Sequence, residues 1–155
     1  MFDYYLLVVY CFKLILSKKA VSFLVLLLCG FLSFGNITIG SWNLQHMGAR
    51  KPDGAIDLMA ECMKDFDLVA LQEIGIREGG AQAVAKLVDA LNRKGQHWDY
   101  SISDPTSAVE EHTGESECYA FIWKTAKVKL RGKAYLAKAF ATVMSREPYI
   151  GVFKA

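Results

Sequence analysis

The sequence predicts a layered α/β (α+β) domain, in which helices cover a mixed sheet. Two observations carry this prediction. Short apolar runs typical of strands alternate with two longer segments whose apolar residues recur every three to four positions, as in amphipathic helices. Further strand-like runs then follow without a helix between them. The order βαβαβ followed by three strands is typical of a sheet with its helices outside.

The first half of the domain alternates strands and helices. A strand at 37–42 leads into a polar, glycine-containing loop at 43–54, and a second strand lies at 68–72. Helices are predicted at 55–64 and 81–92, because each segment has one apolar face. The residues on these two faces are Ile56, Met59, Ala60 and Met63, then Val84, Leu87, Val88 and Leu91.

The second half is predicted to be strands and loops. A strand near 98–102 gives way to a long polar loop at 103–116, and loops of this length are often functional. Segments 118–124 and 127–135 have the pattern of a hairpin, and another strand begins within 149–154. Tryptophans 42 and 123, one in each half, are interpreted as core residues.

The first 35 residues differ from the rest in hydropathy. Two apolar runs, 4–16 and 20–34, are separated by a serine and two lysines. The second run resembles a secretory signal, with small residues at the cleavage-determining positions, and it is shorter than the about 20 residues that span a bilayer. We expect a signal peptide or membrane anchor at 1–35 and a domain at 36–155. Export to the periplasm or the medium is favoured, and membrane attachment through 4–34 is the alternative.

The charge of residues 36–155 is balanced. The first 35 residues hold three lysines and one aspartate, so the 18 basic and 16 acidic residues of the chain become 15 and 15. Such a domain gives no case for bulk attraction to nucleic acid or anionic membranes. Yet seven basic and no acidic residues occur from Cys118 through Arg146, with Arg146 included. Four alternate with small apolar residues: Lys127, Lys129, Arg131 and Lys133.

This alternation predicts a strand with one basic face. It is either a solvated outer face that discourages edge pairing or a strip that contacts a phosphate backbone. The cysteines of the domain indicate less. Cys62 and Cys118 lack the spacing of a zinc site, so two buried lone thiols are expected, and a disulfide would require export.

Two of the predicted strands end in oxygen-donating side chains. Asn43 follows the first strand, and Glu73 follows the second. In layered α/β folds, ligands and catalytic groups collect at the carboxyl ends of the strands. A carboxylate and an amide oxygen suit a hard cation such as Mg²⁺. The sequence therefore predicts that Asn43 and Glu73 converge on one divalent ion.

Four segments in order resemble the endonuclease/exonuclease/phosphatase superfamily, which has the deoxyribonuclease I-like fold. They are ITIGSWNLQ (37–45), DLVALQEI (67–74), ECYAFIWK (117–124) and SREPYIGVF (145–153). The resemblance covers 37–154 and corresponds to the N-terminal half of the family's domain. It implies a β-sandwich with outer helices, truncated to that half and preceded by the apolar segment.

The resemblance also implies roles for five residues. Glu73 corresponds to the carboxylate that binds the catalytic Mg²⁺ or Mn²⁺, and Asn43 to the amide that helps to hold it. Glu117 corresponds to a catalytic acidic residue that supports the family's histidine. Arg146 corresponds to an arginine that contacts phosphate, and Tyr119 lies near the substrate face. The alternatives are a turn for Asn43, solvated carboxylates for Glu73 and Glu117, and pairing of Arg146 with its neighbour Glu147.

The sequence departs from the family's pattern in its second half. The family's catalytic histidine, its Asp-x-Asn pair and its final Asp-His pair have no counterpart, and His46, His97 and His112 do not substitute for them. His46 is interpreted as a solvated loop residue. We therefore expect metal-dependent phosphodiester hydrolysis, on nucleic acid or another phosphodiester, of the complete domain, with this chain weakly active or inactive without the C-terminal half.

Two other functions are compatible with the sequence. One is a non-catalytic pseudoenzyme or a membrane-anchored interaction module. The other keeps the superfamily but changes the substrate, as in a phosphomonoesterase, a phosphoinositide phosphatase or a sphingomyelinase.

Overall fold

The computed structural model of the chain describes residues 36–77, 79–107 and 116–155. The predicted signal or anchor, residue His112 and part of the long polar loop lie outside these residues. Residues Ile37–Ala155 form one compact unit. Among the described residues, no helix has the length and apolarity to cross a membrane.

The secondary structure follows the predicted order. Strands and helices alternate first: β1 (Ile39–Met47), α3 (Asp53–Met63), β2 (Leu68–Gly75), α4 (Gly80–Asn92) and β3 (Trp98–Ile102). A long strand and short elements follow: β4 (Glu117–Lys124), β5 (Lys129–Leu130), β6 (Tyr135–Leu136), the 3-10 helix η1 (Lys138–Phe140), β7 (Tyr149–Ile150) and β8 (Phe153–Lys154). Both helices begin within two residues of the predicted positions, so their apolar periodicity located them.

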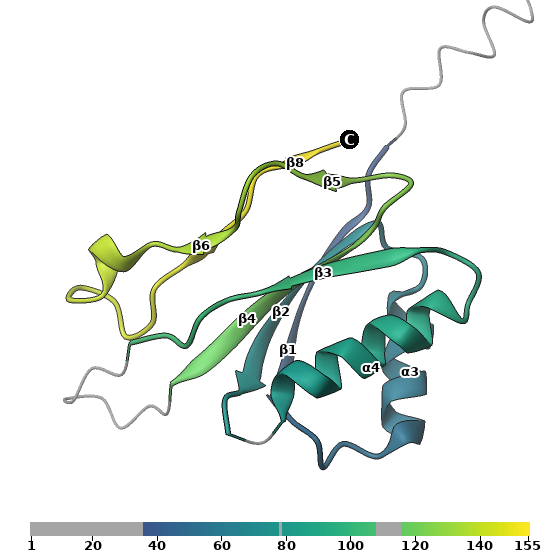
Figure 1. The fold of residues 1–155 in the computed structure, drawn as a ribbon, viewed down its shortest axis with the longest axis horizontal. Coiled ribbons are helices and arrows are strands. Elements are labelled where there is room, and N and C mark those ends of the chain that lie inside the picture. Colours follow the sequence, from purple (N-terminus) through teal and green to yellow (C-terminus); the bar gives the residue numbers. More distant parts are fainter. Residues whose placement is uncertain (1–35, 78, 108–115) are drawn as a thin grey trace, which may run out of the picture. The chain divides into compact units, whose positions relative to one another are not determined.

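The main sheet is mixed, with strand order β1-β2-β4-β3 (Figure 1). Strands β1 and β2 are parallel, and β4 is antiparallel to both β2 and β3. The α/β class is therefore confirmed. Because β1 and β2 run in the same direction, their carboxyl ends lie at one edge of the sheet, where the first residue of β4 also lies.

Helices α3 and α4 cover one face of this sheet (Figure 1). Their apolar residues are buried against it, including Val84, Leu87 and Leu91, none of which has exposed surface. Full burial of one such side chain stabilises the fold by about 1.5–3 kcal/mol. Gly80, the first residue of α4, lies so close to the end of β2 that an added Cβ would overlap the carbonyl of Gly75. This contact seats α4 directly against the sheet edge that carries the candidate site.

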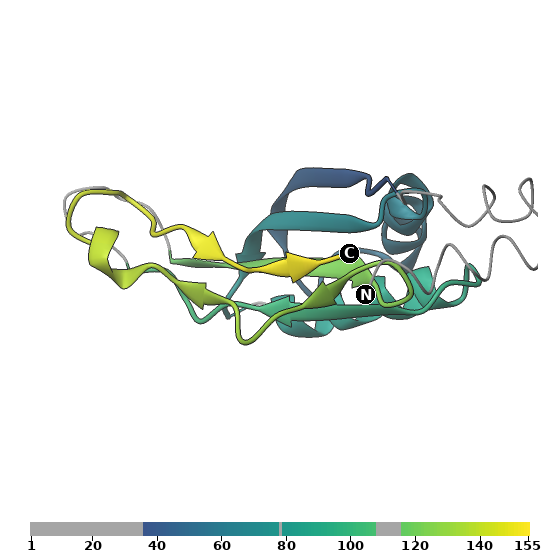
Figure 2. The ribbon, with the colours of Figure 1, turned by 90° about the horizontal axis from the view of Figure 1, so that it is seen from above.

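Short paired strands lie along the other face. Strand β5 pairs with β8 and β6 pairs with β7, both antiparallel, and Figure 2 shows these segments running alongside one another. Between the β5–β8 pair and the sheet, Phe153 contacts Phe121 and Trp123 edge-on, with ring centroids 5.2 and 5.5 Å apart. The buried Trp123 confirms its predicted core role.

The structure corrects three sequence predictions here. Segments 118–124 and 127–135 do not form a hairpin, because β4 is a central strand already bonded to β2 and β3. The chain turns away after Lys124, and β5 finds its partner in β8. Trp42 is 37% exposed, not buried, because it lies on edge strand β1. Both thiols are free, and Cys118 is buried as predicted, but Cys62 is exposed, so the prediction of a buried thiol at that position was wrong.

Candidate metal and phosphate site

Parallel strands β1 and β2 bring Asn43 and Glu73 together. Asn43 is in register with Gln72, the residue before Glu73, and both strands lose regular register just beyond this point. Three non-glycine residues there have left-handed backbone conformations: Gln45 (φ 48°), His46 (φ 60°) and Glu73 (φ 57°). Each such residue costs on the order of 1–3 kcal/mol, and such strain clusters at functional sites.

The side chains of Asn43 and Glu73 contact each other directly. Asn43 Nδ2 donates a hydrogen bond of 2.8 Å to Glu73 Oε1. Asn43 Oδ1 accepts one of 2.9 Å from the main-chain amide of Gln45. This second bond uses one lone pair of the carboxamide oxygen and leaves the other for a further ligand. Both side chains are among the exposed hydrogen-bonding groups of the sheet edge, so solvent and ions reach them.

Glu73 is held in its charged form. The hydrogen bond from Asn43 lowers the pKa of Glu73, and the charges of His46 and Arg146 act in the same direction, against the effect of burial. The main chain of His46 also donates to this carboxylate. An ionised carboxylate is the form that binds a divalent cation.

Glu117 and Arg146 lie next to this pair. Glu117 opens β4 opposite Gly75 at the end of β2, and its side chain is only 10% exposed. Its Oε1 lies 3.4 Å from Nε of Arg146. Burial raises the pKa of Glu117 and the nearby charge of Glu73 adds to this, whereas Arg146 opposes it. The solvated alternative for Glu117 is therefore wrong.

Tyr119 lies two residues after Glu117 in β4, so the two side chains share a face of the strand. The Tyr119 hydroxyl hydrogen bonds to Glu117, and this bond lowers the pKa of the carboxyl. Burial, together with the charge of Glu117, raises the pKa of Tyr119. All five residues singled out from the sequence are thus brought to one edge of the sheet. We refer to Asn43, Glu73, Glu117 and Arg146 as the acidic site.

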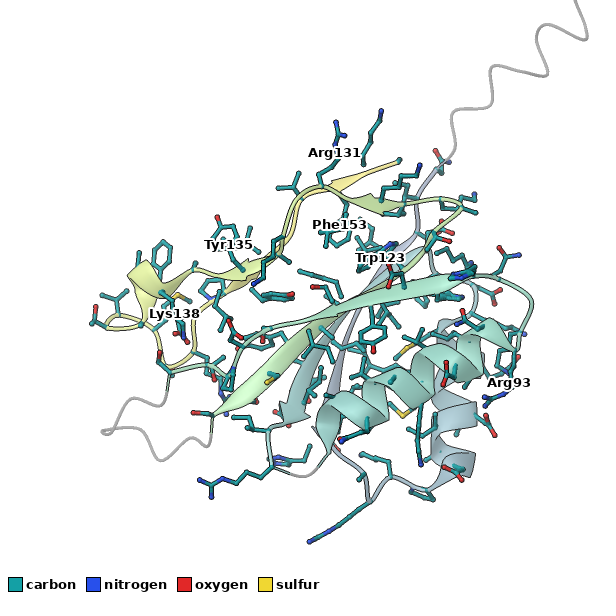
Figure 3. The ribbon with its side chains drawn as sticks, in the orientation of Figure 1. Arg93, Trp123, Arg131, Tyr135, Lys138 and Phe153 are labelled. Atoms are coloured by element: carbon teal, nitrogen blue, oxygen red, sulfur yellow. The ribbon has the colours of Figure 1, made fainter. Side chains whose placement is uncertain are left out.

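The structure also shows partners that the sequence did not predict. Glu147 is buried, with no exposed surface. It accepts hydrogen bonds from Lys138 Nζ at 2.8 Å and from the amide and hydroxyl of Ser107 at 2.8 and 2.6 Å. Figure 3 labels Lys138 at the far end of the short strands. This anchor fixes the chain beside Arg146.

His46 is the second unpredicted member. It is exposed, yet its main chain contacts Glu73, and its charge acts on both Glu73 and Glu117. In the sequence, only its position three residues after Asn43 indicated that His46 could lie near the site. The left-handed backbone at Gln45 and His46, which brings the His46 main chain to Glu73, could not be predicted from residue types. Among the described residues, no group of three His, Cys, Asp or Glu side chains is arranged as a metal site.

The donor types present nevertheless fit a hard divalent cation. An ionised carboxylate and an amide oxygen, with water in the remaining positions, are what Mg²⁺ or Mn²⁺ accepts. The carboxylates of Glu73 and Glu117 also repel each other at this edge, and the charge of Glu73 raises the pKa of Glu117. A cation between them would relieve that repulsion.

Comparison with known proteins points to nucleases. No family model matches the chain. The chain is 31% identical over 144 residues to a curated protein named "Deoxyribonuclease" from Thioalkalivibrio sp. (strain K90mix). The match covers 91% of this chain and 37% of that relative, so the chain spans little more than a third of the relative's length. This similarity indicates a nuclease-like family, and the α/β fold is compatible with it.

Proposed function

We propose that this chain carries the metal- and phosphate-binding part of a nuclease that hydrolyses phosphodiester bonds. The direct contact of Asn43 with Glu73, 2.8 Å apart, is the observation that carries the proposal. It is supported by the neighbouring Glu117–Arg146 pair and by the similarity to a protein named for deoxyribonuclease activity. The deoxyribonuclease I-like superfamily is the family we propose.

Each residue has a separate part in this proposal. Glu73 and Asn43 would hold Mg²⁺ or Mn²⁺, which neutralises charge on the scissile phosphate when bound. Arg146, 38% exposed, presents its guanidinium to a non-bridging phosphate oxygen. Glu117 and Tyr119 position this guanidinium from the buried side. The left-handed backbone at Glu73 directs its carboxylate toward Asn43 and out of the regular ladder.

Hydrolysis also needs a base that takes a proton from the attacking water. Glu73 is occupied with Asn43 and His46, and Glu117 is paired with Arg146, so neither is available for this proton. We therefore expect the chain alone to bind the ion and phosphate with little turnover. Hydrolysis of nucleic acid is proposed for a complete domain of this family, and export remains a prediction.

Manganese binding tests this proposal. Mn²⁺ is titrated into the full chain, in non-ionic detergent where needed, and the free ion is measured by electron paramagnetic resonance. We expect one site that Glu73→Gln weakens at least about tenfold, since the isosteric amide removes only the charge. Glu61→Gln, an exposed acid on α3, is the matched control and should bind as the parent does. Equal affinity in Glu73→Gln and the parent would contradict the proposal.

A further inference from the structure

The most basic surface of the described chain lies away from the acidic site. It consists of Lys127, Lys129, Arg131, Lys133 and Lys154, which we call the basic strip. All five are exposed, and Val128 and Ala134 are buried, but Leu130 is half-buried, Gly132 is exposed and the strand is limited to Lys129–Leu130, so the predicted alternation is confirmed only in part. Figure 3 shows Arg131 on the outer side of the short strands, with Phe153 toward the sheet.

The strip begins at the end of the main sheet opposite the acidic site. The chain enters the strip just after Lys124, near the pairing of Leu68 with Trp123. The acidic site lies at the other end of β2, where Gly75 pairs with Glu117. Eight residues of β2 separate these ends, or about 23 Å at the usual rise of a strand. The strip is therefore a separate surface.

The basic strip places positive charges side by side, and none of them forms an ion pair with a described acidic residue. Lys129 of β5 is directly opposite Lys154 of β8 in the antiparallel ladder, and like charges in this position destabilise a strand pair. Several other cations of the described residues form ion pairs, such as Lys124 with Asp67 and Lys138 with Glu147. No ion pair to any of the five strip residues occurs within the described residues.

Charged side chains, lysine in particular, discourage edge pairing, and protection of a strand edge is the alternative explanation of this arrangement. Here both strands of the β5–β8 pair contribute cations to the same face, and Lys127, Arg131 and Lys133 extend the row beyond the ladder. Such an arrangement favours an extended polyanion as partner.

We propose that the basic strip binds the phosphate backbone of duplex nucleic acid, remote from the acidic site. This inference rests on the proposed function for its choice of nucleic acid over other polyanions. The long side chains of these lysines and this arginine can each reach a backbone phosphate, and such contacts do not read the sequence.

The salt dependence of binding is the quantity that tests the strip. Each neutralised phosphate contributes about −0.9 to the slope of log K against log salt concentration, so five contacts give about −4.5. In Lys127→Gln/Lys129→Gln/Lys133→Gln, two contacts remain, and the slope should fall to about −1.8. Affinity at low salt should fall at least about tenfold.

The assay uses the full chain in non-ionic detergent and a fluorescein-labelled 20-base-pair duplex, by fluorescence anisotropy between about 50 and 200 mM salt. The matched control is Lys86→Gln/Arg93→Gln/Lys94→Gln, within and just after α4, which changes the net charge equally. Figure 3 shows Arg93 at the end of α4, on the other side of the sheet from Arg131. This control should retain the parent slope, since its ion pairs are exposed and contribute little.

Several results would overturn the inference. One is an equal loss of duplex affinity in both triple variants, which would show that only the net charge of the protein matters. Another is an unchanged slope in the strip variant. A third is weaker binding of the strip variant to vesicles with phosphatidylserine but not to the duplex, which would assign the strip to lipid headgroups. Duplex binding through the strip without Mn²⁺ binding at Glu73 would support this inference and contradict the proposed function.

Discussion

Replacement of Glu147 by glutamine tests how the structure supports Arg146. The carboxylate is fully buried, and burial alone would raise its pKa. Hydrogen bonds from Lys138, from Ser107 and from nearby main-chain amides instead lower the pKa of Glu147 from 4.5 to about 2. At about 1.36 kcal/mol per pH unit this corresponds to about 3 kcal/mol. Because Lys138 is 55% exposed and solvent screens the pair, we expect about 2 kcal/mol.

The pH dependence of this loss has a definite sign. The folded pKa is lower than the unfolded one, so the charged carboxylate stabilises the fold above pH 4.5. That contribution is lost as the pH falls toward about 2. Glu147→Gln should therefore lower the free energy of unfolding by about 2 kcal/mol at neutral pH, with a difference that shrinks below pH 4.5.

The assay is urea unfolding followed by circular dichroism at pH 7, 5 and about 3.5. Glu61→Gln is the contrasting variant, because hydrogen bonds from Lys64 and Lys94 also lower the pKa of Glu61 to about 2, but on the exposed side of α3. It should change stability only slightly. A Glu147→Gln cost that is the same at every pH, or absent, would refute the charge-based reasoning.

The other predictions concern α4 and the phosphate contact. Gly80→Ala should destabilise the fold by about 1–3 kcal/mol in the same urea assay, because its Cβ would lie 2.7 Å from Ile74 Cγ2 and closer still to Gly75. Gly54→Ala, with no atom within 4 Å of the added Cβ, should be neutral or stabilising, and equal effects at both positions would contradict the packing at the site edge. Arg146→Gln should weaken Mg²⁺-dependent binding of a dinucleotide about tenfold, with partial recovery in Arg146→Lys, since only the guanidinium contacts phosphate in two places. Arg93→Gln is its control, and a loss of binding there of similar size would show that the effect is not local.

The elements that could be predicted from the sequence are those determined by the periodicity of neighbouring apolar residues. The apolar faces of α3 and α4 are periodic over three turns each, so the helices could be located from residue types alone. The positions of Asn43 and Glu73 after two apolar strands were equally visible. A helix follows each of these strands, which favours parallel pairing of β1 with β2. Parallel pairing places the carboxyl ends of both strands, and so Asn43 and Glu73, at one edge of the sheet.

The rest depended on contacts between residues distant in sequence. Glu147 follows Arg146, and neighbouring opposite charges suggest a pair, but residue types do not show that the Glu147 carboxylate is buried. Its partners, Ser107 and Lys138, come from segments whose approach is set by the tertiary fold. In the same way, β5 pairs with β8 instead of β4, because the free edges of β4 were already used.

The central claim is that Glu73 and Asn43 share one divalent cation. The most direct measurement is the anomalous scattering of Mn²⁺ in crystals of the chain soaked with MnCl₂. The account predicts a peak at about 2.1 Å from a Glu73 carboxylate oxygen, with the Asn43 carboxamide oxygen as a second ligand or one water away. Anomalous peaks only beside other acidic residues, with the Asn43–Glu73 hydrogen bond unchanged, would contradict the claim that these two residues share a cation.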